Sequence, residues 1–193
     1  MLELVYDQFP IRCSLRDGSP CSIRLMNEQD EPVFREFHSI IPEENQLFIR
    51  SKIKDGSLFN EWMANPETGE HLALLTFVDG QLVAIGSLHQ RQGGWKRHIG
   101  KVYFLTHPDF RGQGLINLLL DPIVAIAGNL GLTQLESELN GERETAIESL
   151  GSVGFSELVR LPDYIRDMKA RPHDYVLMGK NLVPDYENLG TGD

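Results

Sequence analysis

The residues best suited to chemistry form one short stretch, Arg111-Gly112-Gln113-Gly114. A β-branched and aromatic run at residues 102–106 precedes it, and apolar residues at helical spacing follow over 115–130. The stretch is therefore expected between a buried strand and a helix, at the N-terminus of that helix. Free backbone N–H groups, the helix dipole and the Arg111 guanidinium would together bind a phosphate group there. Because Gly-x-Gly also marks ordinary turns, a purely structural turn is the alternative.

The N-terminal half of the chain is expected to supply a hairpin and two helices. Residues 11–26 are predicted to form the hairpin, and Asn27 or Asp30 would cap the helix that follows. A second helix is expected at 46–54. The apolar face of the first helix would contain Val33, Phe34, Phe37, Ile40 and Ile41. Burial statistics favour core packing for the aromatic residues of this region, which are Phe34, Phe37, Phe48 and Trp62.

The remaining elements surround the glycine-containing stretch. Residues 72–78 and 82–88, joined across Asp79-Gly80, are the clearest hairpin in the sequence. The basic run at 91–98 is interpreted as a solvated hairpin tip, with contact to an anionic ligand as the alternative. Downstream, a strand is expected at 132–139 and a helix at 142–153.

These motifs, in this order, resemble the GNAT superfamily of N-acetyltransferases. The pyrophosphate loop of that superfamily reads Gln/Arg-x-x-Gly-x-Gly/Ala. Arg111 matches its first position and Gly114 its fourth, while Ile116 stands where Gly or Ala is usual. The pair Ala146-Ile147 ahead of Gly154-Phe155 is also similar to the end of many such domains.

The beginning of the chain is similar to protein-lysine acetyltransferase domains, including those fused to acyl-CoA synthetases. The likeness lies in Leu15-Arg16-Asp17-Gly18, which leads into Ile23-Arg24-Leu25. The resemblance implies an α/β (α+β) GNAT fold, with a mixed central sheet splayed between its fourth and fifth strands and flanked by helices. One domain would cover residues 1–183, and the acidic residues 184–193 would form a flexible tail.

The resemblance also implies acetyl-CoA as cosubstrate and an amine as acceptor. The acceptor groove would border the helical region that follows the first hairpin. The usual asparagine of the superfamily's Asn-x-x-Ala-Ile pattern is replaced by Arg143, and Asn140 lies three residues earlier. The residues expected to hold the cosubstrate are Phe104, Leu105, Thr106, Arg111, Gly112, Gln113, Gly114, Leu115, Ile116 and Asn140.

Amine acetylation requires a group that accepts a proton. Only about 0.04% of a lysine-like amine, with its pKa near 10.4, is deprotonated at pH 7. Many relatives use a glutamate near the start of the fourth strand, and Lys101 stands there in this chain. Lys101 either pairs with a carboxylate, acts as a desolvated base with a lowered pKa, or marks a lost catalytic function.

The next strand offers a replacement for the missing glutamate. Alternation places Glu136 and Glu138 on one face, and Glu138 is the candidate base, acting directly or through water. The alternative is that both glutamates are solvated or ion-paired. The tyrosine that protonates the thiolate in relatives would fall near Leu150, so Tyr164 is the nearest phenol in sequence and the candidate acid.

Composition excludes several other classes of function. The net charge of −10 argues against a nucleic-acid partner, because phosphates need a basic surface. The N-terminal residues lack a signal-peptide pattern, and no stretch approaches the ~20 apolar residues of a membrane span, so a cytoplasmic protein is expected. The histidines show no metal-ligand spacing, so no metal is expected.

Cys13 and Cys21 flank a turn that could bring them together, although reduced thiols are the expectation for a cytosolic chain.

Two main functional hypotheses follow, beside a third, a structural domain that has lost both catalysis and CoA binding. The first is an acetyl-CoA-dependent N-acetyltransferase that acts on a primary amine of a small molecule, a protein lysine or a protein N-terminus, with atypical catalytic residues. The second is a non-catalytic GNAT-like domain that binds acyl-CoA as a sensor or interaction module. The missing glutamate and tyrosine favour the second, whereas the intact Arg-Gly-Gln-Gly stretch favours retained CoA binding. The oligomeric state stays open, with a homodimer as one option.

Overall fold

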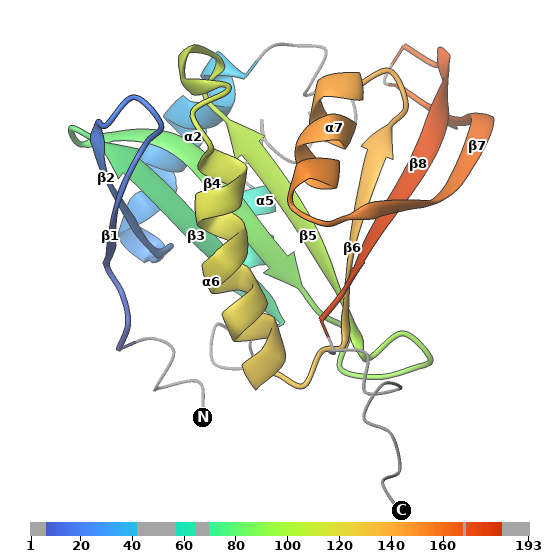
Figure 1. Cartoon of the computed structure of the whole chain (residues 1–193), viewed down its shortest axis with the longest axis horizontal. Coiled ribbons are helices and arrows are strands. Elements are labelled where there is room, and N and C mark those ends of the chain that lie inside the picture. Colours follow the sequence, from blue (N-terminus) through green and yellow to red (C-terminus); the bar gives the residue numbers. More distant parts are fainter. Residues whose placement is uncertain (1–6, 42–56, 65–69, 168, 183–193) are drawn as a thin grey trace, which may run out of the picture.

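The chain forms a single eight-stranded sheet with helices on both faces in the computed structural model (Figure 1), which describes residues 7–41, 57–64, 70–167 and 169–182. The strands are β1 (Ile11–Ser14), β2 (Pro20–Leu25), β3 (His71–Val78), β4 (Gln81–His89), β5 (Ile99–Thr106), β6 (Gln134–Asn140), β7 (Ser156–Arg166) and β8 (Pro172–Asn181). The described helices are α2 (Glu31–Ile40), α5 (Ser57–Met63), α6 (Leu115–Asn129) and α7 (Glu144–Ser152), with 3-10 turns η1 (Glu28–Asp30) and η3 (Pro108–Phe110).

The sheet is mostly antiparallel, in the order β1-β2-β3-β4-β5-β6-β8-β7. Among the described strand pairs, only β5 and β6 run parallel. The connection between these two strands is α6, which is the crossover that a parallel pair requires. This architecture is the expected α+β fold, and the four predicted hairpin strands before residue 90 are all present.

Strand alternation gives the sheet two apolar faces. On β3, Leu74 belongs to a core formed with α6, whereas its neighbour Leu75 belongs to a core formed with α2 and α5. Figure 1 shows α6 in front of the strands and α2 and α5 behind them. Phe34, Phe37 and Trp62 are buried in the second core, as predicted, whereas Ile40 is 42% exposed and does not join the apolar face expected of its helix.

Helix α6 packs very closely on β4 because a glycine faces it. A Cβ added at Gly86 would lie 3.1 Å from Ile123 Cδ1 and 3.2 Å from Leu119 Cβ, so only glycine lets the helix approach this far. Ile123 and Leu119 are themselves almost fully buried. The close fit fixes the position of the N-terminal end of α6, which carries the Arg111–Gly114 stretch.

The sheet opens between β5 and β6. Their pairing extends only from Ile99 opposite Gln134 to Lys101 opposite Glu136, and the Ser137 hydroxyl then donates to the Val102 carbonyl at 3.1 Å. Beyond this point β5 continues with β4 as far as Thr106, while β6 continues with β8 as far as Asn140. Figure 1 shows the resulting wedge between the two strands. The expected splay is therefore present, one strand later in the count because β1 and β2 are separate strands.

The N-terminus of α2 differs in detail from the expectation. Asn27 accepts a hydrogen bond from the Gln29 N–H and caps η1, while Asp30, at the N-cap of α2, makes no side-chain cap there. Its carboxylate instead accepts two hydrogen bonds from Arg24, at 2.6 and 2.7 Å, and one from the Asn27 N–H. Burial alone would raise the pKa of Asp30, but these hydrogen bonds outweigh it and lower the pKa.

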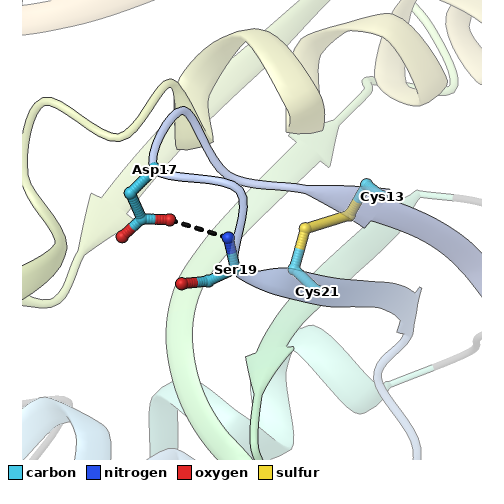
Figure 2. Close-up of a disulfide and its surroundings, with 4 residues drawn as sticks. All are labelled: Cys13, Asp17, Ser19 and Cys21. Atoms are coloured by element: carbon cyan, nitrogen blue, oxygen red, sulfur yellow. Dashed lines mark hydrogen bonds between the residues drawn. A yellow bond between two sulfur atoms is a disulfide. The ribbon is translucent and has the colours of Figure 1, made fainter.

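The cysteine expectation was wrong. Cys13 and Cys21 face each other across the β1–β2 hairpin and form a disulfide, whereas reduced thiols were expected (Figure 2). The physical reason is register: the two residues are directly paired, with Cα atoms 5.0 Å apart, which is the spacing that a disulfide requires. The turn between them is held by the Asp17 carboxylate, which accepts a hydrogen bond from the Ser19 N–H at 2.9 Å.

Some expectations lie outside the described residues, namely the helix at 46–54, Phe48 and the tail at 184–193. None of the described helices is long and apolar enough to cross a membrane.

Candidate active site

The Arg111–Gly114 stretch lies where the sequence placed it, between β5 and α6. Gly112 and Gly114 both adopt positive φ angles, of 77° and 82°, which L side chains rarely adopt. The first backbone bond of α6 runs from the Leu118 N–H to the Gly114 carbonyl, so the N–H groups of the first turn make no bonds within the helix. Arg111 is exposed, and a Cβ at Gly112 would meet no atom within 4 Å. The stretch is therefore an open helix start suited to an anion.

Ile116 stands where the superfamily motif usually has Gly or Ala, and its side chain is directed toward the core. It is partly buried and packs against the core on the α6 face of the sheet. Its backbone N–H still belongs to the first helical turn, and backbone donors do not depend on side-chain type.

The β1–β2 turn braces the stretch from a distant part of the sequence. Arg16 donates from its side chain to the Gly112 carbonyl and from its backbone to the Gln113 carbonyl, each at 3.2 Å. The Asp17 N–H donates to the Gln113 side-chain oxygen at 3.2 Å. We did not anticipate this support, since the residues are 96 positions apart. The conformation of the stretch is thus held by tertiary contacts as well as by its own glycines.

A second arginine lies close to the stretch. Burial and then the positive charge of Arg111 lower the pKa of Arg143, which lies just before α7. The two guanidinium groups therefore repel each other, and a bound anion between them would relieve that repulsion. Sequence reasoning had treated Arg143 only as a departure from the family pattern. Two arginines from distant segments are brought together by the fold.

A cavity of about 980 Å³ lies at the wedge, on the face of the sheet covered by α5. Four residues predicted from sequence line it: Phe104, Leu105, Glu138 and Asn140. The other predicted residues do not, because Thr106 and residues 111–116 lie at or beyond the end of β5, and Tyr164 lies on β7. The structure thus separates the predicted residues into an open helix start and a cavity.

Glu138 is held by two donors inside this cavity. Lys101 Nζ lies 2.6 Å from its Oε1, and the Tyr175 phenol also hydrogen-bonds to it. Burial alone would lower the pKa of Lys101, but the hydrogen bond and charge of Glu138 outweigh it and raise the pKa. Of the three interpretations of Lys101, pairing with a carboxylate is the one confirmed. A lysine with a raised pKa is protonated near neutral pH and cannot serve as a base.

The neighbouring carboxylate is also paired. Glu136 is 4% exposed, and Lys96 Nζ lies 3.2 Å from its Oε2. Lys96 comes from the basic run at 91–98, all of whose residues are exposed, as expected of a solvated tip. The run nonetheless supplies two cations, Arg91 and Lys96, to the cavity wall.

Two phenols line the cavity, Tyr103 and Tyr175, and the predicted Tyr164 does not. Tyr164 is 67% exposed, and its ring lies 5.8 Å from the ring of Tyr175. Burial, followed by the charge and hydrogen bond of Glu138, raises the pKa of Tyr175 to about 12. Leu150, at the usual tyrosine position, is buried in the core. Alternation along β8, where Val176 and Met178 are buried, is the sequence signal that could have placed Tyr175 on the cavity face.

Two histidines complete the opposite wall, and sequence reasoning assigned them no role. His71 Nδ1 and His89 Nδ1 lie 2.6 Å apart, and His89 Nε2 lies 2.8 Å from the Ser87 hydroxyl. Both histidines line the cavity. Burial is the main cause that lowers the pKa of His89, to about 4. Within the residues described, no group of His, Cys, Asp or Glu side chains is placed to hold a metal ion.

Solved structures with the same fold are numerous. A ribosomal-protein-alanine N-acetyltransferase from Brucella melitensis has a TM-score of 0.72 at 21% identity, over 82% of this chain and 98% of that one. The GNAT domain of S. lividans PAT gives 0.70 at 14%, over 89% and 96%. The yncA protein from Salmonella typhimurium, solved with its cofactor acetyl-CoA, gives 0.64 at 15%, over 86% and 96%. At these identities the likeness establishes the fold.

Family membership comes from the sequence itself. Among proteins with curated functions, none matches the chain. The model of the acetyltransferase (GNAT) family, however, matches residues 32–155, which include the wedge, the Arg111–Gly114 stretch and most of the cavity wall. With the fold, the helix start and the match in agreement, the chain belongs to the GNAT acetyltransferase family.

Proposed function

We propose that this chain is an N-acetyltransferase that moves the acetyl group of acetyl-CoA to a primary amine. The amine would belong to a small molecule, a protein lysine or a protein N-terminus. One observation carries the proposal. The open N-terminus of α6 follows β5 in the chain, and, among the described strands, the edge of β5 that faces β6 is unpaired in the wedge. On its β6 side, the described part of β5 has no strand partner after Lys101. An extended pantetheine arm could pair there with the backbone of residues 104–106.

The cosubstrate would be held at three places. Residues 111–116 would bind the pyrophosphate through backbone N–H groups, with Arg111 and Arg143 as counter-charges. Phe104, Leu105 and Thr106 would pair with the pantetheine arm, and Asn140, on the cavity wall of β6, would contact it from the other side of the wedge. The thioester would then lie in the cavity, beside Lys101 and Glu138.

Acetyl transfer forms an N–C bond and breaks the C–S bond. The acceptor ammonium must lose a proton before its nitrogen can attack the thioester carbonyl. The developing oxyanion needs donors, and backbone N–H groups of β5 beyond the last paired residue are available in the wedge. Glu138 is retained as a proposed catalytic group, since its carboxylate lies among Lys101, Tyr175 and the cavity.

Calorimetric titration with acetyl-CoA tests the binding half of the proposal. We expect Arg111→Ala to weaken binding by roughly tenfold, the effect of one charge-assisted hydrogen bond. Arg35→Ala is the matched control, because Arg35 is an exposed arginine on α2 that pairs with Glu31. No binding by the folded wild-type protein would refute both the enzyme and the sensor.

A turnover assay separates these two functions. Acetyl-CoA is supplied with a panel of small amines, lysine-containing peptides and peptides with free N-termini, and CoA release is followed. Amine-dependent release supports the enzyme. Tight binding without release from any amine would favour the acyl-CoA sensor, for which the closed Lys101–Glu138 ion pair at 2.6 Å is the specific argument.

A further inference from the structure

The cavity wall opposite Glu138 contains a hydrogen-bonded chain of three side chains. Ser87, His89 and His71 lie on the same face of β3 and β4, and His71 pairs directly with His89 in the strand register. The chain runs from the Ser87 hydroxyl to His89 Nε2, and from His89 Nδ1 to His71 Nδ1, at 2.8 and 2.6 Å. Ser87 is 1% exposed, whereas His71 lines the cavity. One end of the chain is therefore buried and the other faces the space where substrates meet.

The surroundings keep His89, the inner histidine, neutral. The His89 ring packs edge-on against Trp62 and Tyr103, with ring centroids 5.2 and 5.3 Å away. The charged and titratable groups that act on it are Glu61 from α5, His71 from β3 and Lys101 from β5, with Arg91 acting on Lys101 in turn. Burial and the two like charges outweigh the favourable charge of Glu61, which lowers the pKa of His89 to about 4.

Two proton arrangements of the Ser87–His89–His71 chain satisfy these contacts, because the Ser87 hydroxyl can donate to or accept from His89 Nε2. Because two ring nitrogens face each other at 2.6 Å, one must donate and the other accept. When His89 Nε2 donates to Ser87, His89 Nδ1 has a lone pair and accepts from His71 Nδ1. His71 Nε2 is then left with a lone pair, and no hydrogen bond to this atom is formed within the described residues. In this arrangement the outer nitrogen is a base.

We propose that His71 accepts the proton of the acceptor ammonium, and that His89 and Ser87 act as positioning residues that hold its tautomer. This inference rests on the proposed function and deepens it. It gives the reaction a base other than Lys101, which is protonated, and other than Glu138, whose carboxylate already accepts from Lys101 and Tyr175. It also places the acceptor amine beside His71 in the cavity, on the α5 side of the sheet.

The proton balance is complete without another reagent. The ammonium gives one proton to His71 Nε2 and its nitrogen attacks the thioester carbonyl. As the C–S bond breaks, the second N–H proton is lost and the CoA thiolate takes up one proton. The imidazolium at His71 then releases its proton to solvent at the mouth of the cavity, so the net reaction frees one proton.

The test is the pH dependence of kcat/KM for His71→Asn. Asparagine keeps a polar atom near the position of Nδ1 but has none at Nε2, so the partner of His89 is retained and the base is removed. We expect kcat/KM to fall by roughly 10²-fold, the usual contribution of a general base. We also expect the variant to lose the decline of kcat/KM toward acidic pH that a histidine base would give the wild type. Acetyl-CoA affinity should stay within twofold.

Two comparison variants make the result specific. His98→Asn removes an exposed histidine that does not line this cavity and should behave as wild type. His89→Asn should shift the acidic limb of the profile without abolishing it, because His71 remains but its tautomer is no longer held. Glu138→Gln should lower turnover and keep the acidic limb.

The outcomes distinguish failure of the role of His71 from failure of the proposed acetyltransferase function. Turnover by the wild type, combined with an unchanged rate and acidic limb in His71→Asn, would overturn the role of His71 and leave the acetyltransferase intact. Absence of turnover by the wild type with every amine would overturn both. Nitrogen-detected spectra of the histidines give a readout besides activity. We expect His89 to stay neutral down to about pH 5, and protonation of His89 near neutral pH would contradict the proposed chain.

Discussion

At the scale of single residues, Glu138 and its lysine partner are the clearest case. Glu138→Gln removes the charge that holds Lys101 and Tyr175, whether the carboxylate acts directly or through them. We expect turnover to fall by roughly 10²-fold while acetyl-CoA affinity is nearly unchanged. Steady-state kinetics beside calorimetry checks this. Turnover equal to that of the wild type would remove Glu138 from the mechanism.

The two phenols offer a second test at this scale. Tyr164 was predicted as the acid for the thiolate, but it is 67% exposed, while Tyr175 lies in the cavity. We expect Tyr175→Phe to lower kcat by at least tenfold, since it removes a donor beside the reacting groups. Tyr164→Phe is the matched variant, and a larger loss in it would restore Tyr164 to the site.

Asp30 illustrates how one buried carboxylate supports the fold. Asp30→Asn should lower the free energy of unfolding by about 1–3 kcal/mol, because hydrogen bonds to a charged group are lost. The pKa of Asp30 is lowered in the folded state, so its contribution is present above about pH 4 and is lost as pH falls below it. Urea unfolding at pH 7 and pH 3 measures this, with the exposed Glu28→Gln as control. A difference from wild type that is as large at pH 3 as at pH 7 would contradict the assignment.

At the scale of elements, the root of the wedge depends on a glycine. Gly100 lies in the short segment where β5 pairs with β6. A Cβ added there would lie 2.6 Å from Leu88 Cδ1 and 2.9 Å from Leu132 Cδ1. We expect Gly100→Ala to lower the free energy of unfolding by about 1–3 kcal/mol through overpacking. Gly128→Ala, on α6 with no atom within 4 Å of its Cβ, should instead be neutral or stabilising. Equal stability of the two variants would be inconsistent with this packing.

Elements far apart in sequence also cooperate around the glycine-containing stretch. The β1–β2 turn reaches Gly112 and Gln113 through three hydrogen bonds, and α6 is held against β4 at Gly86. The helix start is therefore fixed from both sides before any ligand binds. Such preorganisation lowers the entropy that binding would otherwise cost.

At the scale of the whole molecule, the Cys13–Cys21 disulfide ties the first hairpin together. The chain-entropy model for a loop of this length suggests a stabilisation of about 2–3 kcal/mol. We expect the double variant Cys13→Ser/Cys21→Ser to unfold at a lower temperature than the oxidised wild type. Reductant should lower the wild type to the same midpoint and leave the variant unchanged. Thiol titration of the denatured wild type under oxidising conditions should find no free thiol, and two free thiols would contradict the bond.

The resemblance to the GNAT superfamily implied the splayed sheet, whereas the sequence by itself determined the order of elements and the position of the Arg111–Gly114 stretch. These features depend on local signals: alternation in strands, helical spacing after Gly114, and turn residues such as Asp79-Gly80. Local patterns persist in the fold because each element must bury the apolar side that its own residues define.

Only the tertiary structure decided which polar groups meet. Alternation placed Glu138 on the face of β6 that lines the cavity, but its partners Lys101 and Tyr175 each lie 37 positions away in the chain, on β5 and β8. The His71–His89 pair, the bracing of Gly112 by Arg16 and the disulfide across Cys13 and Cys21 depend in the same way on strand register. Register is set by the packing of all strands and helices together, so no single segment of sequence contains it.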